Sequence, residues 1–176
     1  MASIFGHGIV GYTISKVAQD KNMTVLVMVA VFSAMLPDFD VIGFAFGIPY
    51  ASPIGHRGFT HSILFALLWA VLSMLFFGKN HKKLWFLIIF FSTVSHGVLD
   101  AMTTGGLGVG FLIPFDNSRF FFPFSPLVVS PIGITNFFSE WGFRVIISEL
   151  KYVLLPCIFI FGIRIIIKSL DKSKEI

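Results

Sequence analysis

The sequence predicts an all-α integral membrane protein: a polytopic bundle of four to five helices with an additional outer segment at the membrane interface. Of its 176 residues, 56% are hydrophobic and only 12% are charged, whereas soluble chains carry about 25% charged residues. The mean hydropathy is +0.89. The apolar residues form long blocks of the length that crosses a bilayer, roughly 20 residues. We therefore expect one membrane-embedded domain covering residues 1–176.

The charge and cysteine content exclude several other classes of protein. The net charge is +4 and the sequence pI is about 9.4, but the basic residues sit between apolar blocks and do not form a stripe on a polar face. We therefore expect membrane lipid as a partner, and we do not expect nucleic acid. Cys157 is the only cysteine, so a disulfide scaffold or a cysteine-rich zinc site is excluded.

Three apolar blocks predict membrane-spanning helices, at residues 59–77, 84–102 and 152–167. Residues 23–36 form a shorter block before Pro37, and residues 4–18 form a weaker, amphipathic stretch that contains several glycines. Whether this first stretch crosses the membrane is left open by its composition. A cleaved signal peptide is not expected, because no basic region precedes the apolar residues.

The positive charges predict the topology, because Lys and Arg concentrate in cytoplasmic loops. If the loop 79–83 is cytoplasmic, alternation places most of the other basic residues on the same side and the C-terminus in the cytoplasm. The nine residues predicted to face the cytoplasm are Lys16, Lys21, Lys79, Lys82, Lys83, Arg164, Lys168, Lys172 and Lys174; the four on the outer side are Arg57, Arg119, Arg144 and Lys151.

Residues 105–148 then form an outer segment that is rich in Phe, Pro and Gly. Because this segment is too apolar for a free loop, we expect it to lie in the interface or to fold back over the helix ends.

Ionisable residues are costly in or near membrane spans, so each needs a partner or a function. His96 and Asp100 are four residues apart and share one face of a predicted helix. That spacing suits two ligands of one metal ion. An alternative interpretation is a hydrogen-bonded pair that neutralises two polar groups inside the bundle.

Asp38 and Asp40 follow Pro37, which we expect to end the preceding helix and set a turn. Two carboxylates at this spacing on a turn point in different directions, so one can bind a metal ion while the other binds a second ion, a water or a histidine. The alternative is a solvated acidic turn that caps a helix.

The stretch Gly55-His-Arg-Gly-Phe-Thr-His-Ser62 contains two imidazoles and a guanidinium. His56 and His61 would lie about 140° apart on a helix, so we place His56 on a loop and His61 in the first turn of the following helix. Thr60 or Ser62 can cap that helix. Arg57 is suited to an anionic oxygen such as that of a phosphate, or alternatively to a lipid headgroup.

Four of the five histidines fall on the predicted outer side, and His81 falls in the basic loop on the other side. Imidazoles and carboxylates without thiolates suit zinc, with manganese or iron as alternatives. Because the donors exceed one tetrahedral set, a dinuclear or trinuclear centre is also compatible with the sequence. Taken alone, His7 is equally well explained as an interfacial residue.

These motifs resemble those of a bacterial family of membrane-bound metal-dependent hydrolases, which includes a LexA-regulated inner-membrane protein. The resemblance rests on Leu36-Pro-Asp-Phe-Asp40, the stretch 55–62, Ser95-His-Gly-Val-Leu-Asp100 with Thr103, and Arg119-Phe-Phe-Phe-Pro-Phe124. The order of these residues is also distantly similar to the zinc-dependent phospholipase C and P1 nuclease superfamily. That likeness implies the metal ligands His7, Asp38, His61, His96 and Asp100, with Asp100 as the bridging ligand. The sequence departs from the superfamily pattern, because no histidine follows Asp100.

The expected function is hydrolysis of a phosphoester in a lipid or lipid-linked substrate, with metal-activated water as the nucleophile. We assign Asp40 or His56 as general base or second-metal ligand, and Arg57 with Arg119 as the residues that hold the anionic substrate. The expected location is the inner membrane, with the site on the extracytoplasmic side. Two alternative functions remain: a metal or ion transporter, and a non-catalytic protein with a structural metal site.

Overall fold

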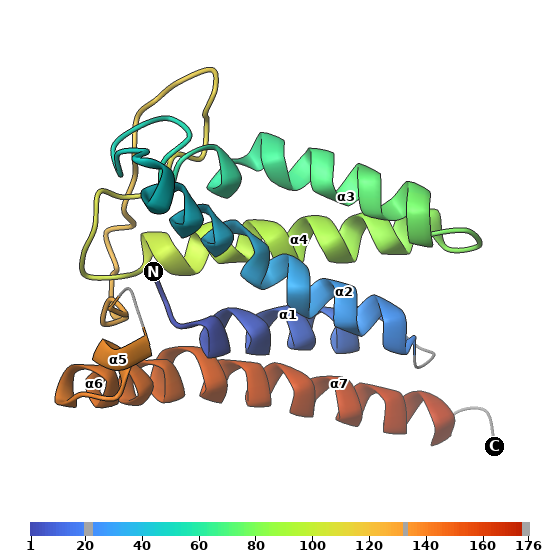
Figure 1. Cartoon of the computed structure of the whole chain (residues 1–176). Coiled ribbons are helices and arrows are strands. Elements are labelled where there is room, and N and C mark those ends of the chain that lie inside the picture. Colours follow the sequence, from blue (N-terminus) through green and yellow to red (C-terminus); the bar gives the residue numbers. More distant parts are fainter. Residues whose placement is uncertain (20–22, 132–133, 174–176) are drawn as a thin grey trace.

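The computed structural model describes residues 1–19, 23–131 and 134–173, and this part of the chain contains helices and no β-strand (Figure 1). The α-helices are α1 (Ile4–Ala18), α2 (Thr24–Met35), α3 (Ile63–Phe77), α4 (Lys82–Ala101), α5 (Ile134–Phe137), α6 (Glu140–Glu149) and α7 (Leu155–Ser173). Two 3-10 helices, Leu36–Phe46 and Phe59–His61, and one π-helical turn, Leu150–Leu154, complete the set.

The predicted all-α membrane bundle is confirmed, since the five apolar blocks correspond to α1, α2, α3, α4 and α7. Three helical stretches are long and apolar enough to cross a membrane: Thr24–Phe46, Lys82–Ala101 and Glu140–Asp171. Helix α3 is equally apolar and shorter, at 15 residues.

Small residues bring α1 and α2 into close contact. A Cβ atom on Gly11 would lie 2.7 Å from the Cβ of Ala34 and 2.8 Å from the carbonyl oxygen of Ala30, so only glycine permits this approach. Small residues at helix interfaces serve this purpose in membranes, where association depends on packing. The close contact fixes the depth of α1 relative to α2 and therefore the position of His7.

Helices α2, α3 and α4 share an apolar core. Leu26, Ala70, Trp85, Ile88 and Ile89 are all buried and pack together. These contacts hold α3 and α4 as an antiparallel pair against α2, so the start of α3 and the end of α4 lie at the same end of the bundle (Figure 1).

The two ends of the bundle differ in composition. The start of α1, the start of α3 and the end of α4 lie together with the irregular segment 103–131, while the turn between α3 and α4 and the end of α7 lie at the opposite end (Figure 1). The predicted grouping of most basic residues at one end agrees with this arrangement; Lys21 and Lys174, and the side chain of Lys172, lie outside the described residues. Which end faces the cytoplasm stays a prediction.

The sequence predicts that Pro37 ends the preceding helix, but the helical path continues through this residue. The chain passes from α2 into the 3-10 helix Leu36–Phe46, in which Pro37 occupies the first turn. The first turn of a helix does not need the N–H group that proline lacks, so proline is tolerated there. Asp38 and Asp40 consequently lie on a continuous helical stretch and not on a turn.

Residues 105–131 fold back over the helix ends, which is one of the two arrangements that the sequence predicts for this segment. The backbone N–H of Ile63 donates to the Phe111 oxygen, and those of Phe122 and Leu127 donate to the Ala101 and Met102 oxygens. The end of the predicted segment forms α6, and this helix continues through the π-helical turn into α7. The segment therefore covers the end of the bundle that carries the ionisable residues.

Candidate metal centre

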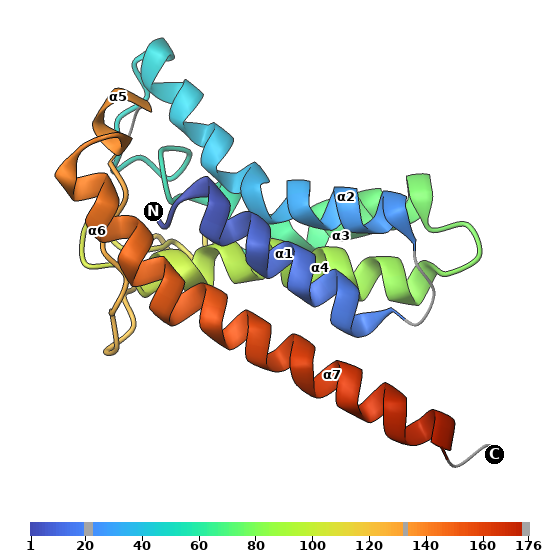
Figure 2. The same cartoon turned by 90° about the horizontal axis from the view of Figure 1, so that it is seen from below.

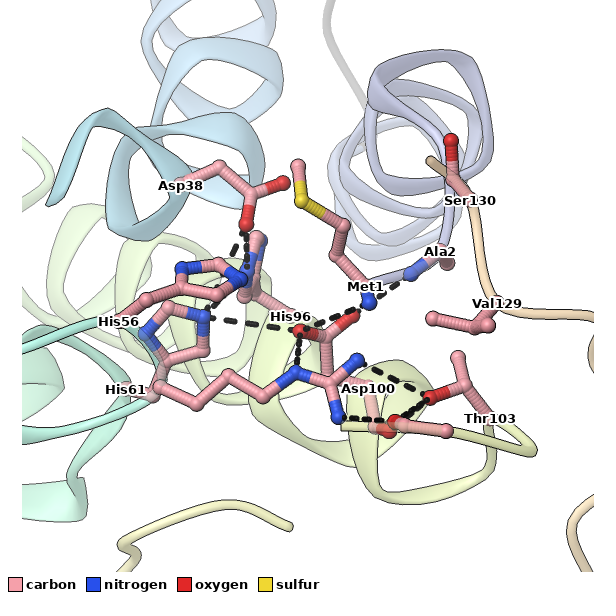
Figure 3. A network of polar contacts seen from close by, with 12 residues as sticks. Met1, Ala2, Asp38, His56, His61, His96, Asp100, Thr103, Val129 and Ser130 are labelled. Carbon is pink, nitrogen blue, oxygen red and sulfur yellow. Dashed lines mark hydrogen bonds and ion pairs between the residues drawn. The ribbon is translucent and has the colours of Figure 1, made fainter. Parts of the chain in front are cut away.

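The five residues predicted as metal ligands meet at one end of the bundle. His7 comes from α1, Asp38 from the 3-10 helix after α2, His61 from the 3-10 helix before α3, and His96 and Asp100 from α4. All five side chains are buried. Asp38, His61, His96 and Asp100 point toward one another in Figure 3, and their donor atoms lie within 4.8 Å of one another.

The distances between these donors match the requirements of a small cation. Tetrahedral ligands at zinc–nitrogen distances of about 2.0–2.1 Å are separated from each other by about 3.3 Å. The Nε2 atom of His96 lies 3.0 Å from Nε2 of His61 and 3.3 Å from Oδ1 of Asp38. Nε2 of His61 lies 3.6 Å from Oδ2 of Asp100 and 3.8 Å from Oδ1 of Asp38.

His7 approaches the same two carboxylates through their other oxygens. Its Nε2 atom lies 3.4 Å from Oδ1 of Asp100 and 3.8 Å from Oδ2 of Asp38, and its ring stacks on that of His96 with centroids 3.7 Å apart. Each aspartate therefore has one oxygen toward His61 and the other toward His7. Oδ1 of Asp100 also accepts a hydrogen bond from the backbone N–H of Ala2 at 2.7 Å.

The ring nitrogens on the far side of two histidines are held by acceptors. Nδ1 of His96 lies 2.7 Å from the carbonyl oxygen of Ala34, and Nδ1 of His61 lies 3.3 Å from Oδ2 of Asp40. When Nδ1 donates to such an acceptor, Nε2 keeps its lone pair and faces the centre. Metal-binding histidines are oriented by contacts of this type.

Several buried polar atoms of the cluster make no hydrogen bond within the protein. These include both oxygens of Asp38 and both ring nitrogens of His7. Buried polar atoms are normally paired, because leaving one unpaired costs about 1–3 kcal/mol. A cation between them would satisfy the carboxylate oxygens and the imidazole lone pairs together, so the donor set fits a metal ion.

Three carboxylates surround the imidazole of His61. The oxygens of Asp40, Asp100 and Asp38 lie 3.3, 3.6 and 3.8 Å from its ring nitrogens. Their combined negative charge favours a cation at the centre of the cluster.

Asp40 links three polar side chains beside the cluster. Its Oδ1 lies 2.6 Å from Nδ1 of His56, and its Oδ2 accepts a hydrogen bond from the Thr60 hydroxyl at 2.7 Å. Asp38 and Asp40 therefore contact His61 from opposite sides, in agreement with the expectation that the two carboxylates diverge. His61 lies just before α3 and not in its first turn, and Ser62 caps that helix by accepting from Phe65 N.

Arg57 is completely buried, and its guanidinium contacts the protein. Its Nε atom lies 3.0 Å from Oδ2 of Asp100, and its terminal nitrogens donate to Gly105 O at 2.8 Å and Thr103 Oγ1 at 3.0 Å. The backbone of Arg57 has a φ of 61°, in the left-handed region that non-glycine residues seldom adopt. In this structure Arg57 orients Asp100, and its predicted contact with substrate stays a prediction.

Gly106 leaves the space that the Arg57 side chain fills. A Cβ on Gly106 would lie 2.7 Å from Nη1 of Arg57, and Gly106 itself has a φ of 93°. The glycine-rich run after α4 is therefore shaped to surround this guanidinium.

Arg119 is only partly buried and holds the loop that carries His56. Its guanidinium donates to the carbonyl oxygens of Tyr50, Ser52 and His56. Arg119 thus lies beside the loop of His56, where a role toward an anionic substrate stays a prediction. His81 is exposed at the opposite end of the bundle, as its basic surroundings suggest.

Sequence reasoning left Glu149 without a role. Its carboxylate accepts hydrogen bonds from the backbone N–H and the hydroxyl of Ser3, the residue that caps α1. This contact joins the start of α1, which carries His7, to the end of α6. The signal in the sequence is an acidic residue next to a long apolar block, where an unpaired carboxylate is costly.

These features define the class of protein: a helical integral membrane protein with a buried histidine and aspartate cluster at one end. The chain belongs to the YdjM inner membrane protein family, whose model matches residues 1–172. It is similar to the inner membrane protein YbcI of Escherichia coli (strain K12), with 41% identity over 141 residues that cover 78% of this chain and 81% of YbcI. No solved structure matches the chain. Family and relative support a location in the inner membrane.

Proposed function

We propose that this protein is a membrane-bound metal-dependent hydrolase that cleaves a phosphoester in a lipid or lipid-linked substrate. The observation that carries the proposal is the convergence of Asp38, His61, His96 and Asp100 within 4.8 Å, with both oxygens of Asp38 lacking any hydrogen bond. Imidazoles and carboxylates are the donors that zinc prefers, with manganese and iron as alternatives. His7 is the fifth ligand.

A bound divalent ion in such a site lowers the pKa of a water molecule and neutralises charge on a phosphoryl oxygen. The remaining residues have separate tasks. Arg57 holds Asp100 in its ligating orientation. Asp40 binds Nδ1 of His56 at 2.6 Å, which leaves Nε2 of His56 as the nitrogen that can exchange a proton with water or a leaving group. Arg119, beside the loop of His56, would bind an anionic oxygen of the substrate.

The position of the site in the bundle supports a lipid as the substrate. The cluster lies where α4 ends and α3 begins, at the end opposite the basic turn between α3 and α4. Helix ends lie at the depth of lipid headgroups, where phosphoesters are found. The positive-inside rule predicts the extracytoplasmic side for this end.

The test combines metal content with hydrolysis. Wild-type protein purified in detergent is expected to contain zinc, manganese or iron by elemental mass spectrometry, and to release products from a panel of phospholipids and polyprenyl phosphates. His96→Ala and Asp100→Ala are expected to lose both the metal and the hydrolysis. His81→Ala is the matched control, because His81 is exposed at the opposite end. Hydrolysis that persists in His96→Ala or Asp100→Ala would contradict the proposal.

A structural metal site is the second candidate, and burial of the cluster favours it. Asp38 is the most exposed ligand, with 9% of its side chain accessible, while His7, His61, His96 and Asp100 have no accessible side-chain surface. An ion there would join α1, α4 and the two 3-10 helices, Leu36–Phe46 and Phe59–His61. Stoichiometric metal without turnover, together with a lower unfolding temperature after chelation, would support this role in place of hydrolysis.

A further inference from the structure

Helix α7 leaves an apolar groove against the rest of the bundle. Figure 2 shows α1 lying between α2 and α7. In the most apolar 18 residues of the helical stretch Glu140–Asp171, which includes α7, only 11% are buried. The groove has a volume of about 740 Å³, with Gly8 and Tyr12 on its α1 wall, Val31 and Met35 on its α2 wall, and Cys157 and Phe161 on its α7 wall.

We propose that this groove binds one acyl chain of a membrane lipid. The binding site stands on the shape and chemistry of the groove, and it does not depend on the proposed hydrolysis.

The groove begins at the end of the bundle that carries the ligand cluster. Gly8 and Met35 of its walls are near His7 and Asp38 in the sequence, but none of the five ligands lines the groove. The α1 wall runs from Ile4 to Thr13, which corresponds to about 13 Å along the helix axis. The groove therefore extends from the headgroup end of the bundle into the hydrocarbon region, in the direction that a lipid tail takes.

The walls of the groove are almost entirely apolar, so they suit an acyl chain and not a polar ligand. No charged residue lines the groove, and of its two hydroxyl-bearing residues Thr13 already donates to the carbonyl oxygen of Ile9 at 2.8 Å. Phe5 and Ile158 are more than half exposed on its walls, so the groove is open to the surrounding lipid. Burial of each methylene group in such a groove is favourable.

Gly8 provides part of the space. A Cβ at this position would meet only ordinary contacts, at 3.6 Å from Met35 Sδ and 3.7 Å from Val31 Cγ1. A larger side chain can therefore be accommodated by the helix and would occupy the groove. Gly8→Leu also replaces a poor helix former with a good one, so the fold should be retained.

A second apolar groove on the other side of α7 supplies a control. It has a volume of about 520 Å³ and is lined by Val17 and Ala18 of α1 and Phe91 of α4, toward the opposite end of the bundle. Val17→Phe fills this second groove with a similar added volume and leaves the first groove unchanged.

The test uses the full chain in nanodiscs of phosphatidylethanolamine and phosphatidylglycerol that contain a phospholipid with a diazirine on one acyl chain. After irradiation, mass spectrometry is expected to find the label on α1, α2 and α7 residues of the first groove. Gly8→Leu places a side chain where the acyl chain would pack, so the chain loses contacts with the groove and labelling there should fall severalfold. Ile158→Trp, from the opposite wall, should have the same effect, and Val17→Phe should leave the labelling unchanged.

Labelling that is unaffected by both Gly8→Leu and Ile158→Trp, or that spreads evenly over the exposed face of α3, would overturn the acyl-chain site. Cross-links between two copies of the chain in place of lipid adducts would do the same. Metal content and hydrolysis are measured on the same samples. If the groove is labelled but the protein has neither metal nor turnover, the proposed hydrolase is refuted and the acyl-chain site is not. If the protein has turnover but the groove variants do not change the labelling, only the acyl-chain site is refuted.

Discussion

Replacing Arg57 by alanine should destabilise the folded protein even when no substrate is present. The guanidinium is fully buried and contacts Asp100, Thr103 and Gly105. A residue that binds substrate lowers activity when it is removed, but it does not hold the fold together. The stability of this variant therefore distinguishes the role seen in the structure from the role predicted from the sequence.

The expected size of the effect follows from these contacts. Removing one partner of a buried ion pair costs about 3–5 kcal/mol where the remaining charge is left uncompensated. Asp100 has no accessible side-chain surface, but it keeps its contacts with His7, His61, the N–H of Ala2 and the N-terminal amino group, so we expect the lower end of that range. For a chain of this length, about 3 kcal/mol corresponds to a decrease of about 6–12 °C in the unfolding midpoint. Arg57→Lys should recover only part of this, because an ammonium group cannot reach all three acceptors.

Thermal unfolding in detergent, followed by circular dichroism in the presence of a chelator, measures the effect without a contribution from bound metal. Arg144→Ala is the matched control, because Arg144 and Glu140 form an exposed ion pair one helical turn apart, and such pairs contribute about 0.3–0.5 kcal/mol. If Arg57→Ala unfolds at the same temperature as Arg144→Ala, the guanidinium does not support the cluster, and the structural role of Arg57 is refuted.

Two further predictions follow from the arrangement of the helix ends. Glu149→Gln should lower the stability by about 1–2 kcal/mol, because it weakens charge-assisted hydrogen bonds with Ser3; the exposed Glu140→Gln serves as control, and equal midpoints for the two variants would contradict the role of Glu149 in holding α1. In a Cys157→Ser background, a cysteine at exposed Asn117 should react with a membrane-impermeant thiol reagent added outside intact cells, while one at exposed Asn80 should react only after permeabilisation. Labelling of both from the same side would overturn the predicted topology.

Much of the fold could be predicted because apolar blocks in lipid have few structural choices. A stretch such as Lys82–Ala101 must satisfy its backbone hydrogen bonds internally, so it forms a helix. The same local periodicity placed His96 and Asp100 on one face. The helical path through Pro37 was not predicted, because proline both ends helices and begins them, and only the contacts after it decide which.

The sequence predicted which residues form the candidate site more readily than it predicted what each residue does there. Residue type and the cost of placing such groups next to apolar blocks indicated the clustering of ionisable residues, and the resemblance to the phospholipase C and P1 nuclease superfamily implied the ligand set His7, Asp38, His61, His96 and Asp100. The role of Arg57 in orienting Asp100 was not predicted. The direction of the Arg57 side chain depends on its left-handed backbone and on Gly106, which is distant in the sequence. Glu149 and Ser3 are 146 residues apart, and no local pattern connects them.

The sequence by itself determined that this chain is a helical membrane protein in which four of the five histidines and several acidic residues gather at one end, since burying charge in lipid is too costly to occur without a purpose. Only the tertiary structure decided which oxygen faces which nitrogen. Donor distances of 3.0–3.8 Å arise when helices distant in sequence pack at one depth, and that depth is set by contacts such as Gly11 against Ala34. Local patterns choose the helices, and long-range packing places their side chains.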